Sequence, residues 1–258
     1  MIDIHDLWKA YGTNQVLRGL SLKVEKGETL VILGRSGVGK SVLLKHIIGI
    51  AQAEKGHIEV DGIRVSDLKS EKRYALTKNM GMLFQGAALF DSMNIEDNTA
   101  FYLKQHGNLK TGKKYTKQEI ADMVEHALEM VDLAGVQKKM PSDLSGGMRK
   151  RAGLARLIVY RPEYLLYDEP TTGLDPITAM QINELIVKTQ EELKATSIVV
   201  THDIISALFV GDRLALHKDG KIAYIGKPDE FLQIDDPIIE FLRKTISEDP
   251  RSFRSKLT

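Results

Sequence analysis

The sequence contains no cysteine among its 258 residues. This absence excludes disulfide bonds, zinc sites with thiolate ligands and iron–sulfur clusters held by cysteine. Long apolar runs are also missing. A membrane-spanning helix needs about 18 consecutive apolar residues, and no segment of the chain reaches that length. We therefore expect any function at a membrane to depend on partner proteins that provide the spanning helices.

An excess of charge of one sign is absent too. The 36 basic residues nearly balance the 35 acidic ones, which gives a formal net charge of +1. Because a chain without a strong positive field attracts nucleic acid poorly, we expect no nucleic-acid partner. The first residues, Met1 to Asp6, lack the basic and apolar regions of a secretory signal. Together these features predict a cytoplasmic protein.

The sequence does contain a series of short apolar runs bounded by glycine or polar residues. Apolar residues make up 43% of the chain, which is enough for a buried core. The runs most typical of buried strands are residues 29–34, 81–85, 164–168 and 197–201. Because helical patterns separate these runs, they predict an α/β fold with a mainly parallel sheet covered on both faces. Shorter, turn-rich runs between residues 2 and 60 predict antiparallel strands that lean on this sheet.

These patterns divide the chain into four segments. Residues 1–86 hold the antiparallel β part and the first half of the α/β core. Strand signals stop in residues 87–144, where helical patterns predict an inserted helical subdomain. Residues 145–234 return to the second half of the core, and residues 235–258 form a C-terminal extension.

Four local patterns lie within these segments. Thr116 and Glu119 have the spacing of a capping box at the start of a helix. Residues 218–220 have the signature of a hairpin turn. Pro237 is placed to open an amphipathic helix that reaches residue 246, and the polar residues 251–258 do not form a core. Residues 107–114 have the composition of a solvated loop.

One segment matches the pattern G-x-x-x-x-G-K-[ST] and lies between a predicted strand and a predicted helix. Its residues are Gly34, Arg35, Ser36, Gly37, Val38, Gly39, Lys40 and Ser41. Glycines allow backbone N–H groups to surround an anion, and the helix N-terminus adds positive potential. Lys40 would reach the outer phosphates, and Ser41 would offer its hydroxyl to magnesium. The alternative is a glycine-rich turn with an incidental lysine, but the flanking elements favour the phosphate loop of a P-loop NTPase with a RecA-like sheet.

A second candidate is the pair of carboxylates at the end of the apolar run Tyr164 to Asp168. Asp168 is placed to hold the water shell of a magnesium ion, and Glu169 to orient or deprotonate an attacking water. Adjacent carboxylates can also be helix caps or solvated charges, and the pair taken alone does not distinguish these alternatives from a catalytic role. Because a phosphate loop needs a magnesium ligand, the best-placed acidic pair after an apolar strand is the stronger candidate.

The segment Leu144 to Arg151 resembles the signature sequence of the ABC family of ATPases. Ser145, Gly146 and Gly147 precede a helical run, so they form a second anion-binding helix N-terminus. The resemblance implies a head-to-tail homodimer in which each ATP lies between the phosphate loop of one subunit and the signature of the other. It also implies hydrolysis of ATP with Mg²⁺ as cofactor. The basic residues 149–151 are predicted to be solvated or paired locally.

The resemblance covers almost the whole chain and implies further site residues. Tyr11 is similar to the aromatic residue that stacks on adenine, and Val16 to a residue that packs against the same base. Gln85 is similar to the glutamine that senses magnesium, Asp175 to a residue of the loop that crosses to the opposite site, and His202 to the histidine that touches the γ-phosphate. Plainer alternatives are a core tyrosine, a solvated glutamine, a helix cap and a structural histidine. The implied catalytic residues are Glu169, His202, Gln85 and Lys40, and the implied magnesium ligands are Ser41, Gln85 and Asp168.

A lone cassette with one phosphate loop and one signature is typical of a transporter subunit. Residues 83–95, 146–151, 175–178 and 236–242 are similar to those of Mla-type and Mce-associated lipid-transport ATPases. This likeness implies phospholipid as the cargo and a multi-span membrane permease that docks near Gln85 and Phe90. It further implies a small regulatory protein and a lipid-binding Mce-type protein as partners, and a peripheral position on the inner face of the cell membrane.

Two features depart from the pattern of these relatives. Gly173 stands where alanine is usual, and the loop of residues 107–114 is longer than expected. Neither departure removes a catalytic group, but both affect contacts with other subunits. The alternative function from another class is a soluble ABC ATPase that drives iron–sulfur cluster assembly, since such an ATPase is also a lone cassette.

Overall fold

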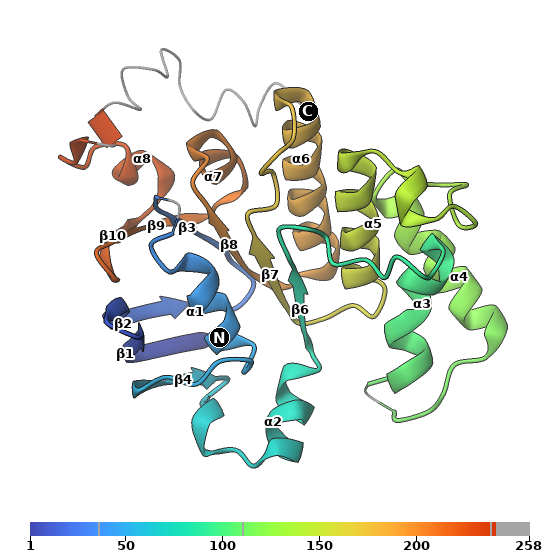
Figure 1. The fold of residues 1–258 in the computed structure, drawn as a ribbon, viewed down its shortest axis with the longest axis horizontal. Coiled ribbons are helices and arrows are strands. Elements are labelled where there is room, and N and C mark those ends of the chain that lie inside the picture. The colour runs from blue at the N-terminus through green and yellow to red at the C-terminus, as the bar shows by residue number, and fades with distance from the viewer. Residues whose placement is uncertain (36, 110, 238, 241–258) are drawn as a thin grey trace. The chain divides into compact units, whose positions relative to one another are not determined.

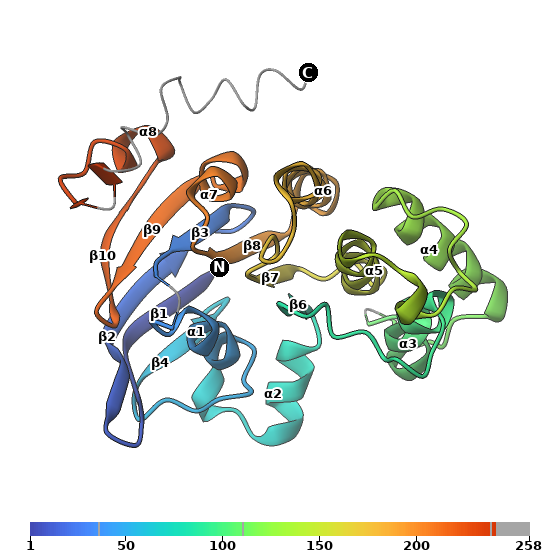
Figure 2. The same ribbon diagram turned by 45° about the horizontal axis from the view of Figure 1, so that its top comes forward.

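The computed structural model describes residues 1–240 except residues 36, 110 and 238 (Figures 1 and 2). The described residues form two compact units, one made of Met1–Lys78 with the residues from Thr196 to 240, the other of Asn79–Ala195. The helix predicted over residues 237–246 falls largely outside the described residues, as does the polar tail of residues 251–258. The division into four segments stays a prediction, because the two units reflect which residues contact one another, whereas the four segments were defined by their expected roles.

The first unit contains the predicted antiparallel sheet. Its strand order is β2 (Asn14–Val24), β1 (Ile2–Tyr11), β4 (Lys55–Val60) and β5 (Ile63–Arg64), and all neighbours are antiparallel. Figure 1 shows β1, β2 and β4 side by side in blue. Burial alternates along β1, where Ile2 and Ile4 are buried while Asp3 and His5 are only partly covered. This period of two gives the sheet one apolar face and one polar face.

The same unit contains a parallel group of strands. β3 (Thr29–Leu33) lies between β8 (Thr196–Thr201) and β9 (Arg213–Lys218) and runs parallel to both. β3 and β8 are buried along their whole length, which explains why residues 30–33 and 198–200 are apolar without interruption. β10 (Lys221–Gly226) pairs antiparallel with β9 and confirms the predicted hairpin turn. The remaining elements are α1 (Lys40–Ile47), η1 (Val65–Asp67), α2 (Ser70–Thr77), α7 (Ile204–Val210) and α8 (Pro228–Phe231).

The second unit pairs two parallel strands with four α-helices. β6 (Met80–Leu83) runs parallel to β7 (Tyr164–Asp168). The helices are α3 (Ile95–His106), α4 (Lys117–Met130), α5 (Gly146–Ile158) and α6 (Pro176–Leu193), with η2 (Pro141–Asp143) before α5. Figure 2 shows α3, α4 and α5 as one group of packed helices. The predicted capping box is confirmed, because Thr116 Oγ1 accepts from Glu119 N while a Glu119 carboxylate oxygen accepts from Thr116 N.

The predicted strand over residues 81–85 is shifted and shorter than expected. β6 ends at Leu83, two residues before Gln85. The chain turns there, since Ala87 N donates to Phe84 O at 2.9 Å and both Ala87 and Ala88 have positive φ angles. The longest described helix, α6, carries several charged residues. Across the described part of the chain, every helix is too short or too polar to cross a membrane.

Candidate active site

The phosphate-loop residues connect β3 to α1 in the first unit, as the sequence predicted. Lys40 is buried, and its Nζ donates to the backbone oxygens of Gly34 and Arg35 at 2.8 and 2.9 Å. Gly37 and Gly39 have φ angles of 81° and 105°, in the left-handed region that favours glycine. The loop therefore wraps around the ammonium group of its own lysine. Ser36 lies outside the described residues.

Gly39 also brings Val16 to the loop. A Cβ atom built on Gly39 would lie 2.4 Å from Val16 Cγ1 and 3.2 Å from Val16 O, so a larger residue would collide with β2. Tyr11, at the end of β1, is 52% exposed, with Lys9 Nζ 5.3 Å from its ring centroid. The alternative of a core tyrosine is therefore wrong. An exposed ring remains available for stacking on a base.

The start of α1 has the properties of an anion site. Its N-cap is Gly39, which offers no side-chain acceptor to the first-turn N–H groups, and the first turn holds no acidic residue. Five other described helices are capped by an acceptor side chain, namely Asn94, Thr116, Ser145, Asp175 and Asp203. Because a helix N-terminus attracts negative charge, the positive end of α1 and the Lys40 ammonium fit the phosphates of a nucleotide.

A buried histidine that the sequence prediction did not single out lies against the loop. His217, on β9, is 2% exposed, and neither ring nitrogen has a hydrogen-bond partner among the described residues. A Cβ atom on Gly34 would lie 2.8 Å from His217 O, so backbone and loop are in close contact. Burial, and secondarily the charge of Lys40, lower the pKa of His217 to about 4. At neutral pH the ring is therefore uncharged and adds no positive charge beside Lys40.

His202 follows β8 directly and is exposed, as a residue that meets a ligand would be. The next residue, Asp203, caps α7 by accepting from Ile205 N at 3.0 Å. Tyr11, Val16, residues 34–41 and His202 all belong to the first unit, while Gln85, Ser145, Gly146, Gly147, Asp168, Glu169 and Asp175 belong to the second.

The two carboxylates lie at the end of the buried strand β7 in the second unit. Asp168 and Glu169 are both largely buried. Glu169 has a φ angle of 50°, so the backbone turns at this residue. Thr172 Oγ1 donates to Glu169 Oε2 at 3.1 Å and fixes the orientation of the carboxylate. Neither residue is a helix cap, since the next helix, α6, begins at Pro176 with Asp175 as its N-cap.

Lys150 is a site residue that the sequence prediction misplaced. We expected residues 149–151 to be solvated or paired locally, yet Lys150 is 6% exposed. Its Nζ donates to the backbone oxygen of Gln85 and, at 3.4 Å, to that of Glu169. Burial lowers the pKa of Lys150, against the opposing charges of Asp168 and Glu169. The only signal in the sequence was its place in the signature segment, on the same helical face as buried residues such as Leu154 and Leu157.

The signature residues begin α5 and contact the start of α6. Ser145 is the N-cap of α5, and its Oγ accepts from Met148 N at 3.3 Å. A Cβ atom on Gly147 would lie 2.5 Å from Thr178 Cγ2, so the glycine permits this close approach. Asp175 caps α6, accepting from Ile177 N, Thr178 N and, at 2.6 Å, Thr178 Oγ1. These hydrogen bonds, that of the Thr178 hydroxyl first, lower the pKa of Asp175. The helix-cap alternative for Asp175 is therefore correct, and its role at an opposite site stays a prediction.

Besides Lys150, Arg156 of α5 also holds the segment after β6. The Arg156 guanidinium lies 4.4 Å from the ring centroid of Phe90 and 5.9 Å from that of Phe101, and it donates to Ala88 O. Phe90 remains partly exposed. Asn98 adds two further bonds, since Phe90 N donates to its Oδ1 at 2.8 Å and its Nδ2 donates to Phe90 O at 3.0 Å. This segment therefore presents an aromatic surface on a well-supported backbone.

Comparison with known proteins agrees with this geometry. Residues 17–172 match the family model described as ABC transporter. Because the match covers more than half of the chain, the chain belongs to the ABC transporter family. It is an ATP-binding, ATP-hydrolysing cassette with the α/β fold of a P-loop NTPase.

Two relatives and one solved structure illustrate the likeness. The probable ribonucleotide transport ATP-binding protein mkl of Mycobacterium leprae is 39% identical over 92% of this chain and 67% of its own length. The intermembrane phospholipid transport system ATP-binding protein MlaF of Haemophilus influenzae is 38% identical over 98% of this chain and 94% of its own length. A dimeric post-hydrolysis state of the ATP-binding cassette MJ0796 with ADP and Pi has a TM-score of 0.80 and 29% identity, over 88% of this chain and 99% of that one. The match thus covers about two thirds of the length of the mycobacterial relatives, 67% in Mycobacterium leprae and 65% in Mycobacterium tuberculosis.

Proposed function

We propose that this chain works as a homodimer on the inner face of the cell membrane and energises the movement of phospholipid through a separate permease. The observation that carries the proposal is the match with MlaF, which extends over nearly the full length of both proteins. The mycobacterial relatives named for ribonucleotide transport are of similar identity, but the chain accounts for only about two thirds of their length. Phospholipid is therefore the better-supported cargo.

The phosphates of ATP would lie over the loop of residues 34–41. The backbone of this loop, the start of α1 and the Lys40 ammonium offer positive potential to the β- and γ-phosphates. Tyr11 and Val16 would hold the adenine ring, Tyr11 by stacking. Mg²⁺, when bound by Ser41, Gln85 and Asp168, would neutralise the charge that develops on the phosphates. Oxygen donors of this kind are the ligands that Mg²⁺ prefers.

Glu169 would orient the attacking water and accept its proton. Its carboxylate is held by Thr172 and its backbone by Lys150, so the group is already positioned before substrate arrives. His202 would contact the γ-phosphate from the exposed end of β8. In this proposal a Glu169 Oε atom accepts the proton, and the Lys40 ammonium offsets the negative charge on the γ-phosphoryl group as it is transferred to water.

The signature residues would complete the site of a second copy. Ser145, Gly146 and Gly147 begin α5 with exposed backbone at a helix N-terminus. The dimer in the MJ0796 structure supports a two-subunit arrangement. A multi-span permease would dock near Gln85 and Phe90, and a small regulatory protein and an Mce-type lipid-binding protein are the further proposed partners. All relatives described above carry transport names, which does not favour the iron–sulfur assembly alternative.

The hydrolytic role of Glu169 is tested by Glu169→Gln. Because glutamine keeps the shape but cannot accept a proton, we expect ATP binding to persist while turnover falls by about 10²- to 10⁴-fold. The matched control is Glu163→Gln, an exposed glutamate just before β7, which should turn over at the wild-type rate. Phosphate release and nucleotide binding are measured on both variants. Wild-type turnover by Glu169→Gln would contradict the assigned role.

The proposed cargo is tested with the chain purified in detergent together with the membrane protein that it binds. After reconstitution into vesicles, we expect ATP-dependent movement of labelled phospholipid. Two outcomes would contradict the proposal: movement of ribonucleotide without phospholipid, and recovery of the chain only with soluble iron–sulfur scaffold proteins. Glu169→Gln assembled with the same permease serves as the inactive control.

A further inference from the structure

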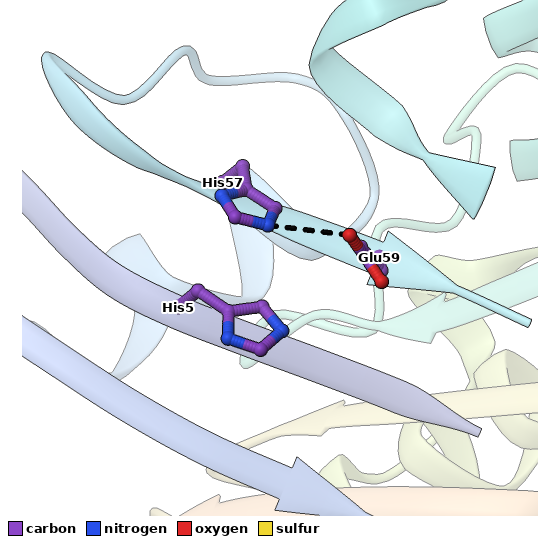
Figure 3. A group of neighbouring side chains, drawn as sticks. All are labelled: His5, His57 and Glu59. Carbon is purple, nitrogen blue, oxygen red and sulfur yellow. Dashed lines mark ion pairs between the residues drawn. The ribbon is translucent and has the colours of Figure 1, made fainter. Parts of the chain in front are cut away.

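Four potential metal ligands lie together on the polar face of the antiparallel sheet, at the strands β1 and β4. In the strand register His5 stands opposite His57, and Asp3 stands opposite Glu59. Residues two apart on a strand point to the same face, so the two pairs form a square of side chains. Figure 3 shows the rings of His5 and His57 facing each other across the two strands, with the Glu59 carboxylate beside His57. No role in the proposed ATP site uses these residues.

The ligand atoms of this square are already close. One ligand atom each from His5, His57 and Glu59 lie within 4.8 Å of one another. His57 Nε2 is 3.3 Å from Glu59 Oε1, and His5 Nε2 is 3.3 Å from Asp3 Oδ1. The two imidazole rings are stacked, with centroids 4.7 Å apart and planes at 20°. Because the nitrogen lone pairs lie in the ring planes, small rotations about the side-chain bonds turn both toward a common point.

We propose that His5, His57 and Glu59, with Asp3 as a fourth ligand, form a binding site for Zn²⁺. Two imidazoles with carboxylate oxygens are a donor set that suits zinc, whereas Mg²⁺ and Ca²⁺ prefer oxygen alone. Zinc takes nitrogen and oxygen ligands at about 2.0 to 2.2 Å, which places ligand atoms of a tetrahedron about 3.4 Å apart. The 3.3 Å pairs already have that spacing. Among His5, His57 and Glu59 the remaining separations need to close by little more than 1 Å, which side-chain rotation allows in partly exposed groups.

A neighbouring arginine competes with a cation at this place. Arg64, on β5, has its Nη2 3.2 Å from His57 Nε2 and its Nε 4.0 Å from Glu59 Oε1. Arg64 Nε also lies 3.8 Å from Asp67 Oδ2, so the guanidinium has a second carboxylate to which it can turn. On the other side, Lys23 of β2 stands opposite Asp3 but pairs with Glu25 at 2.9 Å. Zinc binding therefore requires Arg64 to move, and removal of Arg64 should tighten it.

The experiment measures Zn²⁺ alone binding to the full chain without nucleotide, by competition with a chromophoric chelator. We expect one Zn²⁺ per chain, and a loss of affinity of at least about tenfold in each of His5→Ala, His57→Ala and Glu59→Gln. The matched control is His126→Ala, which removes a histidine whose Nε2 lies 3.4 Å from a single carboxylate, that of Glu192. This variant should bind Zn²⁺ as the wild type does.

Arg64→Ala gives a signed second test, since it should bind Zn²⁺ several-fold more tightly than the wild type. Circular dichroism and ATP turnover of each variant show that the fold is retained, because these residues take no part in the ATP site. The proposal is overturned by the absence of saturable binding, by binding that survives either histidine substitution, or by weaker binding in Arg64→Ala. The failure of the lipid-transport proposal would leave this site unaffected.

Discussion

Replacing Lys150 with methionine removes the buried ammonium group that holds the backbone oxygens of Gln85 and Glu169. Methionine is similar in length and apolar, so the change deletes the charge and its hydrogen bonds while largely filling the same space. The two carbonyl oxygens would lose a donor within the protein. We expect the Lys150→Met protein to fold but to be less stable and slower in ATP hydrolysis, because Glu169 would be held less firmly.

The magnitude follows from the two contacts. A hydrogen bond to a charged group contributes about 1.5 to 3 kcal/mol. The contact with Gln85 is close, whereas that with Glu169, at 3.4 Å, is near the limit of hydrogen bonding and adds little. Burial of the ammonium opposes the gain, as the lowered pKa of Lys150 indicates. We therefore expect a loss of about 2 kcal/mol in the free energy of unfolding, which lowers Tm by roughly 4 to 8 °C in a chain of this size.

The matched control is Lys104→Met on α3, in the same unit. The Lys104 side chain is 49% exposed, and its ammonium group pairs with Asp97 at 2.6 Å. A surface pair of this kind contributes about 1 kcal/mol or less, so Tm should change little. Thermal unfolding of the wild type and both variants at pH 7, with urea unfolding as a second measurement, gives the comparison. If Lys150→Met unfolds at the same temperature as Lys104→Met, the assignment of Lys150 as a structural tie is refuted.

Three further predictions concern the nucleotide site. Lys40→Ala should weaken ATP binding by at least about tenfold, because a charge-assisted contact with phosphate is worth more than 1.4 kcal/mol; calorimetry that finds unchanged affinity would contradict the phosphate loop. Ser145→Arg should abolish ATP-driven pairing of two chains in sedimentation experiments, while a dimer that still forms would argue against the signature as the contact surface. The pKa of His217 in the folded protein is lowered to about 4. Below pH 6.5 the histidine therefore binds a proton in the unfolded chain but stays neutral in the folded one, so the protein becomes less stable as the pH drops from 6.5 toward 4. The expected loss in the free energy of unfolding is about 1.6 kcal/mol between pH 6.5 and 5. His217→Met should remove this part of the loss in urea unfolding at the two pH values.

The sequence predicted those parts of the fold that depend on local patterns. The apolar runs that became β3, β7 and β8 were recognised because strands buried on both faces are continuously apolar. The capping box at Thr116 was predicted from spacing alone, since both hydrogen bonds are made within four residues. The predicted end of β6 was wrong by two residues. The turn after the strand gives Ala87 and Ala88 positive φ angles, and alanine rarely adopts such angles, so the sequence did not indicate a turn there.

The sequence could not predict contacts between distant segments. Lys150 stands between two arginines, and a run of three basic residues favours a solvent-exposed position. Only the folded chain brings Lys150 to Gln85 and Glu169. His217 directly precedes the predicted hairpin turn of residues 218–220, but its burial depends on the approach of Gly34, which follows β3. Asp175 satisfied both a local and a long-range interpretation, and the structure establishes the local one as the cap of α6.

Arg156 connects the segment around Phe90 to helix α5, and the signature residues lie at the opposite end of that helix. Arg156 lies near the C-terminal end of α5, whereas Ser145, the N-cap of the same helix, lies about 16 Å away at 1.5 Å per residue. A tilt of only about 5° at this lever would move the Ser145 end by roughly 1.4 Å. A protein that presses on Phe90 would therefore shift the far tip of α5 by a distance comparable to the margin between a formed and a broken hydrogen bond.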